Sequence, residues 1–272
     1  MTAAPRVSLV VAVYRRPDFL ERIFVALEGQ SFADFEVAIA DDGSGPEIAD
    51  LVARWQGRFR EPIVHAWQED RGFRKTIVVN RAVALSRGAT LVFLDGDCVP
   101  HHRFLERHVG RTRPGQALSG RRVMLDEEIT RRLTLDDIRS RRLERPSFWW
   151  RHAAPRERRN GLFAPWLYGW RGGFNDRYEI LGCNFSLSRQ DFLRVNGYDE
   201  RIVRRGMEDT NLKTRLVNAG VAVRCLAQEA IVYHCDHGKA EADHDREAVE
   251  RWGGTHETWT PFGVVKGEPP AA

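Results

Sequence analysis

The sequence predicts an α/β protein built on a mostly parallel central sheet flanked by helices. Short apolar, β-branched runs recur at residues 7–13, 35–40 and 90–95, as in strands that are covered on both faces. Between these runs, apolar residues recur at helical spacing, and the alternation continues to about residue 110. Ligands of such a sheet bind where the carboxyl ends of its strands meet.

In the first half of the chain, Asp18 is placed to cap the first helix and Gly29 to end it. The expected order is strand 7–13, helix 18–28, strand 35–40, helix from Pro46, strand 62–67, helix 76–87 ending at Gly88, and strand 90–95. After residue 111 the alternation fades. The expected elements there are strand 117–125, polar helix 126–145, strand 183–188, a short helix capped by Ser188, helix 208–219 and strand 221–227.

Composition excludes several classes of protein. The chain has 272 residues, 42% hydrophobic and 29% charged, which excludes disorder, collagen and coiled coil. No apolar run reaches the roughly 18 residues of a membrane span, and the N-terminus lacks the features of a secretory signal, so we expect a cytoplasmic protein. Four cysteines without a C-x-x-C pair predict free thiols.

Two acidic motifs follow predicted strands. Asp95-Gly96-Asp97 ends the strand TLVFL and presents two carboxylates that suit Mg²⁺ or Mn²⁺; an ordinary acidic turn is the alternative. Asp41 and Asp42 end the strand FEVAIA, where a carboxylate can accept a hydrogen bond from a base imide or a ribose hydroxyl. Helix capping ahead of Pro46 is the alternative for that pair.

These motifs carry a family resemblance. VSLVVAVYRRPDFL, IADDGSG and LVFLDGDCVPHHRF resemble family 2 glycosyltransferases of the GT-A fold in their order and spacing. GCNFSLSRQDFLRVNGYDERIVRRGMEDTNLKTRL is similar to the galactosyltransferase-like segment of chondroitin-polymerase-type enzymes. The resemblance covers residues 5 to about 110 and 180 to about 237.

The resemblance implies an inverting transfer of a sugar from a nucleotide diphosphate donor, usually UDP-linked, to an acceptor hydroxyl. The residues it places around the donor are Ala12, Val13, Tyr14, Asp41, Asp42, Asp95 and Gly96. It implies that Asp97 is the direct metal ligand and that His234 completes the site, with His237 as a close rival. Mn²⁺ tolerates an imidazole ligand better than Mg²⁺ does.

Gly206 to Asp209 resemble the G-x-E-D element of the family, which stands at the start of a helix and faces the acceptor. The attacking hydroxyl must lose its proton, so the resemblance implies Asp209 as general base and Glu208 as an acceptor contact. Favourable charge at a helix N-terminus is the simpler explanation of both.

The resemblance also places basic and amide side chains at the donor. It implies donor contacts from Arg71, Lys75 and Asn80. Arg71 and Lys75 stand where relatives carry basic residues that pair with phosphates, and Asn80 belongs to the pair Asn80-Arg81, whose order is the reverse of the usual one. Asn184 stands in the strand that lines the donor sugar, where a buried amide needs hydrogen-bond partners.

One segment carries the basic character of the chain. The net charge is +4, and residues 139–159 alone contribute eight arginines against two glutamates. The nearby aromatic residues, Trp170 among them, suggest an acceptor platform or docking to an anionic membrane surface; a solvated helix face is equally compatible. No nucleic-acid module surrounds the segment, so we expect no nucleic-acid partner.

The expected organisation is one GT-A-like domain over residues 1–237 and a C-terminal tail or lid at 238–272. Within the domain we expect a nucleotide-sugar half at about 5–110, an insertion at about 126–180 and an acceptor half at about 181–237. The expected partners are a UDP-sugar and a glycan or glycolipid, in bacterial surface polysaccharide or lipopolysaccharide synthesis. A non-catalytic binding module of the same fold and a nucleotidyltransferase are the alternatives.

Overall fold

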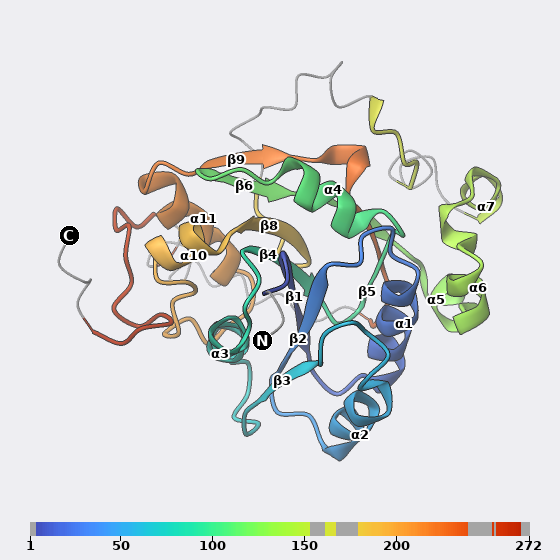
Figure 1. The fold of residues 1–272 in the computed structure, drawn as a ribbon, viewed down its shortest axis with the longest axis horizontal. Helices are drawn as coiled ribbons and strands as arrows, with labels where there is room; N and C mark the ends of the chain where they lie inside the picture. Colours follow the sequence, from blue (N-terminus) through green and yellow to red (C-terminus); the bar gives the residue numbers. More distant parts are fainter. Residues whose placement is uncertain (1–3, 153–160, 167–178, 239–251, 253, 268–272) are drawn as a thin grey trace.

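A seven-stranded sheet forms the centre of the molecule in a computed structural model that describes residues 4–152, 161–166, 179–238, 252 and 254–267 (Figure 1). Its strand order is β3-β2-β1-β4-β8-β6-β9. The bounds are Val64–Trp67 (β3), Phe35–Asp41 (β2), Val7–Val13 (β1), Thr90–Asp95 (β4), Asn184–Ser188 (β8), Gln116–Ser119 (β6) and Ala222–Cys225 (β9). Strand β8 runs antiparallel to both neighbours and the other pairs are parallel, which confirms the predicted fold class.

Helices cover both faces of this sheet. They are α1 (Pro17–Glu28), α2 (Pro46–Trp55), α3 (Lys75–Leu85), α4 (Phe104–Arg111), α10 (Arg189–Arg194) and α11 (Glu208–Asn218). Because side chains alternate along a strand, Leu9 and Val11 of β1 pack into the core shared with α1 and α2, while Val10 packs into the core shared with α3 and α11. The two apolar layers explain why the parallel strands read as continuous apolar runs.

A second, three-stranded sheet is connected to the first, because β5 (Cys98–Pro100) follows β4 and β7 (Arg121–Met124) follows β6 along the chain. Its third strand is β10 (Ile231–His234), and the order is β5-β10-β7. The single strand predicted at 117–125 was therefore wrong, since β6 and β7 belong to different sheets. Gly120 lies at the break, where a Cβ atom would approach the Asn184 side chain to 2.2 Å.

The polar helix predicted at 126–145 was also wrong, because the chain starts new helices inside it. Asp126 caps α5 (Glu127–Arg132), and Thr134 forms a capping box with Asp137 at the start of α6 (Leu135–Arg139). A 3-10 turn, η1 (Arg142–Glu144), and α7 (Pro146–His152) follow.

Two helix ends differ from expectation. Helix α1 begins at Pro17 after Arg16, and Asp18 lies in its first turn, where its carboxylate pairs with the Arg16 guanidinium at 2.8 Å instead of capping. Helix α3 ends at Leu85 because Ser86 is extended. The predicted Ser188 cap is confirmed, since its hydroxyl accepts from the Asp191 amide.

The C-terminal residues 254–267 pack against the body of the protein. Thr260 is fully buried, and Phe262 O accepts a hydrogen bond from the Glu200 amide at 3.0 Å. Among the described residues, no helix combines the length and apolar character needed to span a bilayer. All four cysteines are buried thiols.

Candidate functional site

A cleft of about 540 Å³ opens at the carboxyl ends of β1, β2 and β4. The start of α3, the start of α11 and the end of β10 complete its walls. The residues that line it are Ala12, Val13, Tyr14, Arg15, Arg16, Phe19, Ala40, Asp42, Gly72, Phe73, Lys75, Asp95, Gly96, Asp97, Arg205, Glu208, His234 and His237. The cleft thus lies where a parallel sheet is expected to bind its ligand.

Asp97, His234 and His237 form a cluster at one side of the cleft. Pairing of β10 with β5 sets His234 opposite Cys98, and the Asp97 carboxylate lies 3.4 Å from His234 Nε2 and 3.1 Å from His237 Nε2. Burial opposes ionisation of Asp97, but the hydrogen bond from His237 and the favourable electrostatic interaction with His234 hold its pKa below the ordinary value. The three residues can each offer one ligand atom, all within 4.8 Å of one another.

The chemistry of this cluster fits a divalent transition metal. Burial lowers the pKa of His234, which keeps its imidazole neutral, the form that binds a metal. Its Nδ1 is buried and has no hydrogen-bond partner among the described residues. One carboxylate and two imidazoles suit Mn²⁺ better than Mg²⁺, which prefers oxygen ligands.

Lys75 lines the cleft between the D-G-D motif and the start of α11. Its ammonium group lies 2.7 Å from the Asp95 carboxylate, at the start of α3. Burial alone would lower the pKa of Lys75, but the charges of Asp95, Asp209 and Glu208 hold it above the ordinary value. A permanent positive charge therefore stands among three carboxylates.

Glu208 and Asp209 begin α11 and differ in their surroundings. Glu208 lines the cleft and accepts from the Gly206 amide at 2.7 Å. Asp209 accepts from the Tyr198 hydroxyl and from the Gly182 amide, both at 2.9 Å, and is half-buried. Burial raises the pKa of Asp209 to about 7, opposed by Lys75 and assisted by the charges of Glu208 and Asp95.

The opposite end of the cleft carries Tyr14 and Asp42. The Tyr14 hydroxyl donates to Asp70 at 3.0 Å, and Asp42 accepts from the Arg74 amide at 2.9 Å and from Gln68 at 2.6 Å. Burial raises the pKa of Asp42 in spite of these hydrogen bonds.

Comparison with known proteins decides the family. The family model for glycosyl transferase family 2 matches residues 8–164, more than half of the chain. The chain belongs to glycosyl transferase family 2. A second model, described as the N-terminal domain of galactosyltransferase, matches residues 172–238.

Two curated relatives extend this assignment. The chain is 28% identical over 240 residues to validoxylamine A glucosyltransferase of Streptomyces hygroscopicus subsp. jinggangensis (strain 5008), covering 80% of this chain and 52% of that protein. It is 23% identical over 262 residues to chondroitin synthase of Escherichia coli, covering 89% of this chain and 36% of that protein. The chain therefore spans about half the length of the first of these relatives, and less of the second.

Solved structures agree on the fold. A mannosyltransferase from Pyrobaculum calidifontis, in complex with GDP-Man and Mn²⁺, superposes with a TM-score of 0.59 at 17% identity, covering 92% of this chain and 62% of that one. S. aureus TarS in complex with UDP gives 0.56 at 12% identity, covering 84% and 60%. The predicted GT-A fold is confirmed.

Four residues that the resemblance places at the donor do not line the cleft, and neither does Asp209, the expected general base, which lies next to Glu208. Asp41 is buried and accepts from the Ser44 amide, and Arg71 pairs with Glu69. The buried amides of Asn80 and Asn184 are also engaged within the protein: Asn80 bonds Tyr198, and Asn184 donates to Arg121 O and Ala230 O. Trp170, the expected acceptor contact, lies outside the described residues.

Other lining residues were not among the sequence candidates. Arg15 and Arg16 directly follow β1, so the strand-end rule that selected Tyr14 also applies to them. Phe73 follows Gly72, and Arg205 precedes Gly206 of the G-x-E-D element, where only the acidic pair was considered. Arg205 and Phe73 face each other, with the guanidinium carbon 5.8 Å from the ring centroid.

A second histidine cluster, His101, His102 and Glu144, is structural. His101 Nδ1 accepts from the Arg103 amide at 3.1 Å, so Nε2 carries the hydrogen and faces Glu144 at 3.5 Å. Burial lowers the pKa of His101 to about 3, which keeps it neutral. A protonated Nε2 has no lone pair for a metal, so this cluster ties η1 to the turn before α4.

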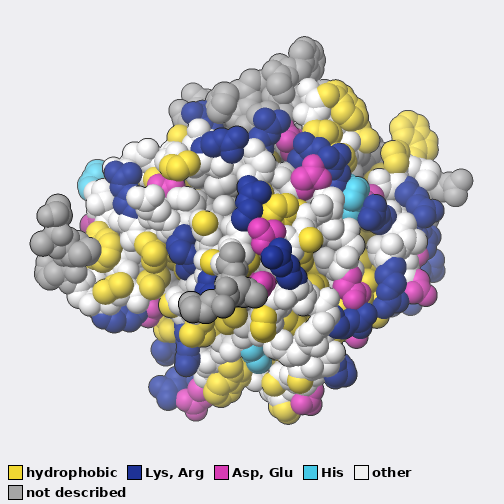
Figure 2. Space-filling model, viewed as in Figure 1, with side chains coloured by type: hydrophobic (Ala, Val, Ile, Leu, Met, Phe, Trp, Pro, Cys, Tyr) yellow, Lys and Arg dark blue, Asp and Glu magenta, His cyan; other side chains and the backbone are white. Residues whose placement is uncertain are grey.

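The basic segment is partly described. Trp149 is buried against Tyr233, whereas Trp150 on α7 and Trp166 are 74% and 70% exposed. On the face drawn in Figure 2, Lys and Arg side chains are spread over the surface and include the side where Figure 1 places α6 and α7. Of the two exposed tryptophans, Trp150 lies within the arginine-rich residues 139–159 and Trp166 follows them.

Proposed function

We propose that this protein is a divalent-metal-dependent, inverting glycosyltransferase. It would move a sugar from a nucleotide diphosphate sugar to a hydroxyl of a glycan or glycolipid. One observation carries the proposal: the histidine and aspartate cluster, the Lys75–Asp95 pair and Glu208 all line one cleft, and Asp209 follows Glu208 at the start of α11. Each of the three supplies a different requirement of the reaction.

Asp97 and His234 would hold the metal, with His237 as a third ligand. A bound Mn²⁺ or Mg²⁺ would neutralise the charge of the departing diphosphate. Lys75 stands beside Asp95 and can approach the same phosphates without changing its own protonation state. The Asp95 carboxylate pairs with that cation, and the charges of Asp209 and Glu208 help to keep it protonated.

Asp209 is proposed as the general base and Glu208 as the acceptor contact. A general base works best with a pKa near the operating pH, and the pKa of Asp209 is about 7. Three charged groups that act on Asp209, namely Lys75, Glu208 and Asp95, line the cleft. Glu208 itself lines the cleft and is the competing base, so the two carboxylates must be tested separately.

The donor is proposed to be UDP-linked. Asp42 lines the far end of the cleft and can accept a hydrogen bond from the imide of uracil. The TarS structure holds UDP, whereas the mannosyltransferase structure holds GDP-Man, so GDP is the competing nucleotide.

The acceptor is proposed to be a glycan or glycolipid of bacterial surface polysaccharide synthesis. Exposed Trp150 and Trp166 offer faces for sugar rings, and the arginines of the segment offer pairing to phosphate or carboxylate groups. The same features would allow contact of a cytoplasmic enzyme with an anionic membrane surface.

The experiment compares Asp209→Asn with Glu208→Gln. Release of UDP from UDP-glucose and UDP-N-acetylglucosamine, and of GDP from GDP-mannose, is followed with MnCl₂ and with water as acceptor. Loss of a general base costs about 10²- to 10⁴-fold in rate. We therefore expect the rate of Asp209→Asn to fall at least about 10²-fold, while its affinity for the nucleotide stays within about twofold of the unaltered protein. Glu179→Gln, an exposed carboxylate that pairs with Lys213, is the matched control.

Each result has a defined meaning. A larger loss in Glu208→Gln than in Asp209→Asn would transfer the role of base to Glu208. Nucleotide binding without any release or transfer in the unaltered protein would favour the non-catalytic module.

A further inference from the structure

Tyr198 lies beneath Asp209 in the loop between α10 and α11. Its side chain is only 2% exposed, and its hydroxyl donates to Asp209 Oδ1 at 2.9 Å. The ring packs edge-on against Phe93 of β4, with centroids 6.3 Å apart, and against Phe192 of α10. The hydroxyl therefore reaches Asp209 from the core of the protein.

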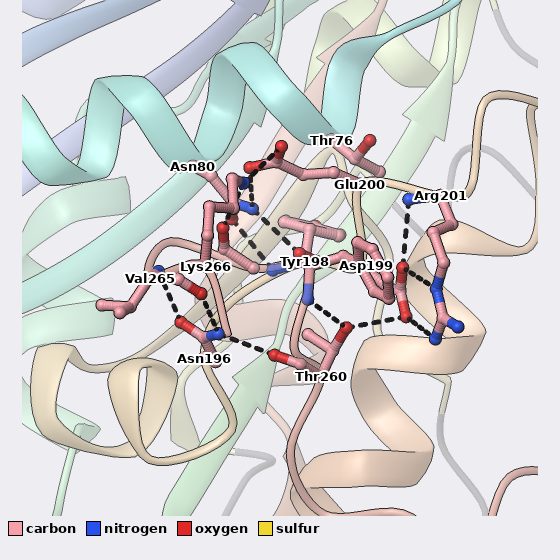
Figure 3. A network of polar contacts seen from close by, with 12 residues as sticks. Thr76, Asn80, Asn196, Tyr198, Asp199, Glu200, Arg201, Thr260, Val265 and Lys266 are labelled. Carbon is pink, nitrogen blue, oxygen red and sulfur yellow. Dashed lines mark hydrogen bonds and ion pairs between the residues drawn. The ribbon is translucent and has the colours of Figure 1, made fainter. Parts of the chain in front are cut away.

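Asn80 of α3 fixes the backbone of Tyr198 from one side. Its Nδ2 donates to Tyr198 O at 2.8 Å and its Oδ1 accepts from Tyr198 N at 2.9 Å, so both main-chain groups bond to one amide (Figure 3). Gly197 allows this approach, because a Cβ atom there would lie 2.6 Å from Asn80 Oδ1. The Asn80 side chain thus fixes the main chain of Tyr198 and does not line the cleft.

The C-terminal segment fixes the same loop from the other side. Asn196 donates to Thr260 O and to Val265 O, both at 2.7 Å, and Asp199 accepts from the Thr260 hydroxyl at 2.8 Å (Figure 3). Lys266 pairs with Glu200 at 2.6 Å. Residues 260–266 therefore hold Asn196, Asp199 and Glu200, while α3 holds Tyr198 between them.

We propose that Tyr198 is a positioning residue, which orients the Asp209 carboxylate through its hydroxyl and is itself held by Asn80. The inference rests on the proposed function of Asp209 as base. The Gly182 amide occupies Oδ2 at 2.9 Å, and a Cβ atom at Gly182 would approach the carboxylate to 2.4 Å. Two donors on opposite oxygens fix the plane of the carboxylate, as a preorganised base requires.

The hydroxyl also favours the ionised form of Asp209. The other charged groups that act on this carboxyl are Lys75 from α3, Asp95 from β4 and Glu208 from α11, and none of them changes when the Tyr198 hydroxyl is removed. A hydrogen bond to a charged group contributes about 1.5 kcal/mol or more, which corresponds to about one pKa unit. Loss of the hydroxyl therefore raises the pKa of Asp209.

The test is Tyr198→Phe, which removes one oxygen and keeps the ring. The matched control is Tyr233→Phe, because Tyr233 is equally buried and its hydroxyl has no partner among the described residues. In the full-length protein the Asp209 carboxyl is titrated by ¹³C NMR, with its signal assigned by absence from Asp209→Asn. The pH dependence of UDP release from UDP-glucose, with MnCl₂, is measured in parallel.

In Tyr198→Phe we expect the titration and the acidic limb of the rate profile to move up by about one pH unit. The rate at about pH 7 then falls about fivefold or more, with an unchanged KM for UDP-glucose. Tyr233→Phe follows the unaltered protein. If Asp209 titrates at the same pH in Tyr198→Phe as in the unaltered protein, the inference is overturned and the proposed function stands. Full activity of Asp209→Asn would instead overturn the assignment of Asp209 as the base.

Discussion

Asp97 lines the cleft and Asp209 adjoins it beside Glu208, and the pKa values of these two aspartates shift in opposite directions. Burial opposes ionisation of both, but His237 and His234 more than offset it at Asp97, whereas Lys75 only partly offsets it at Asp209. The residue type is the same, and the neighbours decide the chemistry. One aspartate is thereby suited to binding a cation and the other to accepting a proton.

The raised pKa of Asp209 predicts a pH dependence of stability. Between its ordinary pKa and about 7, the folded protein holds a proton that the unfolded chain releases, so its stability falls as pH rises through that range. Asp209→Asn does not titrate. The midpoint of thermal unfolding in Asp209→Asn, minus that of the unaltered protein, should therefore increase from about pH 5 to about pH 8 in EDTA. A difference that is constant with pH would contradict the assigned pKa.

Residue identity predicted the acidic groups better than the amides. Asp42, Asp95, Asp97 and Glu208 line the cleft. Asp41 does not, because its carboxylate turns to the Ser44 amide, and Asp209 only adjoins it. Asn80 and Asn184 do not line the cleft, since an amide can bond equally well to the protein interior, and only the three-dimensional structure shows which way it points.

At the scale of elements, the strand and helix alternation to residue 95 was predictable, and the second half was less so. Apolar periodicity located β1, β2 and β4 to within a residue. It did not separate β6 from β7, because both are apolar enough to be strand and the change of sheet at Gly120 depends on contact with Asn184. One helix was predicted over 126–145, because Asp126 and Thr134 were not identified as the N-caps of two separate short helices, α5 and α6.

The contact of loop 196–200 with residues 260–266 predicts a stability difference between two asparagines. Asn196→Ala removes three hydrogen bonds, to the buried Thr260 carbonyl and to the part-buried Val265 carbonyl and amide, at a cost of about 2 kcal/mol or more. Asn196 also has a φ of 62°, which alanine adopts less readily. Chemical denaturation and limited proteolysis of residues 254–267 measure the effect.

Asn218→Ala is the control, because Asn218 donates to Thr255 O and Glu257 O at the exposed side of the same segment. We expect a loss below about 1 kcal/mol, since water replaces these bonds. Equal losses in the two variants would show that burial of the Asn196 contacts contributes nothing.

At the scale of the whole molecule, the two sheets bring together residues that are far apart in the sequence. β10 pairs with β5, which follows the D-G-D motif, so His234 comes to lie beside Asp97 across 137 positions. The family resemblance predicted that meeting, whereas spacing alone could not, because no local pattern links the two segments. The presence of both histidines at Asp97, and not one of them, became visible only in the structure.

The central claim is that this cleft binds a nucleotide diphosphate through a metal held at Asp97. The most direct test is calorimetric titration of UDP and of GDP, with MnCl₂ and with EDTA, into the unaltered protein, Asp97→Ala and the surface control Asp34→Ala. We predict that one nucleotide binds with Mn²⁺, that EDTA weakens it at least about tenfold, and that Asp97→Ala with Mn²⁺ behaves like the unaltered protein in EDTA. Equal affinity with and without metal, or unchanged metal-dependent binding in Asp97→Ala, would contradict the account.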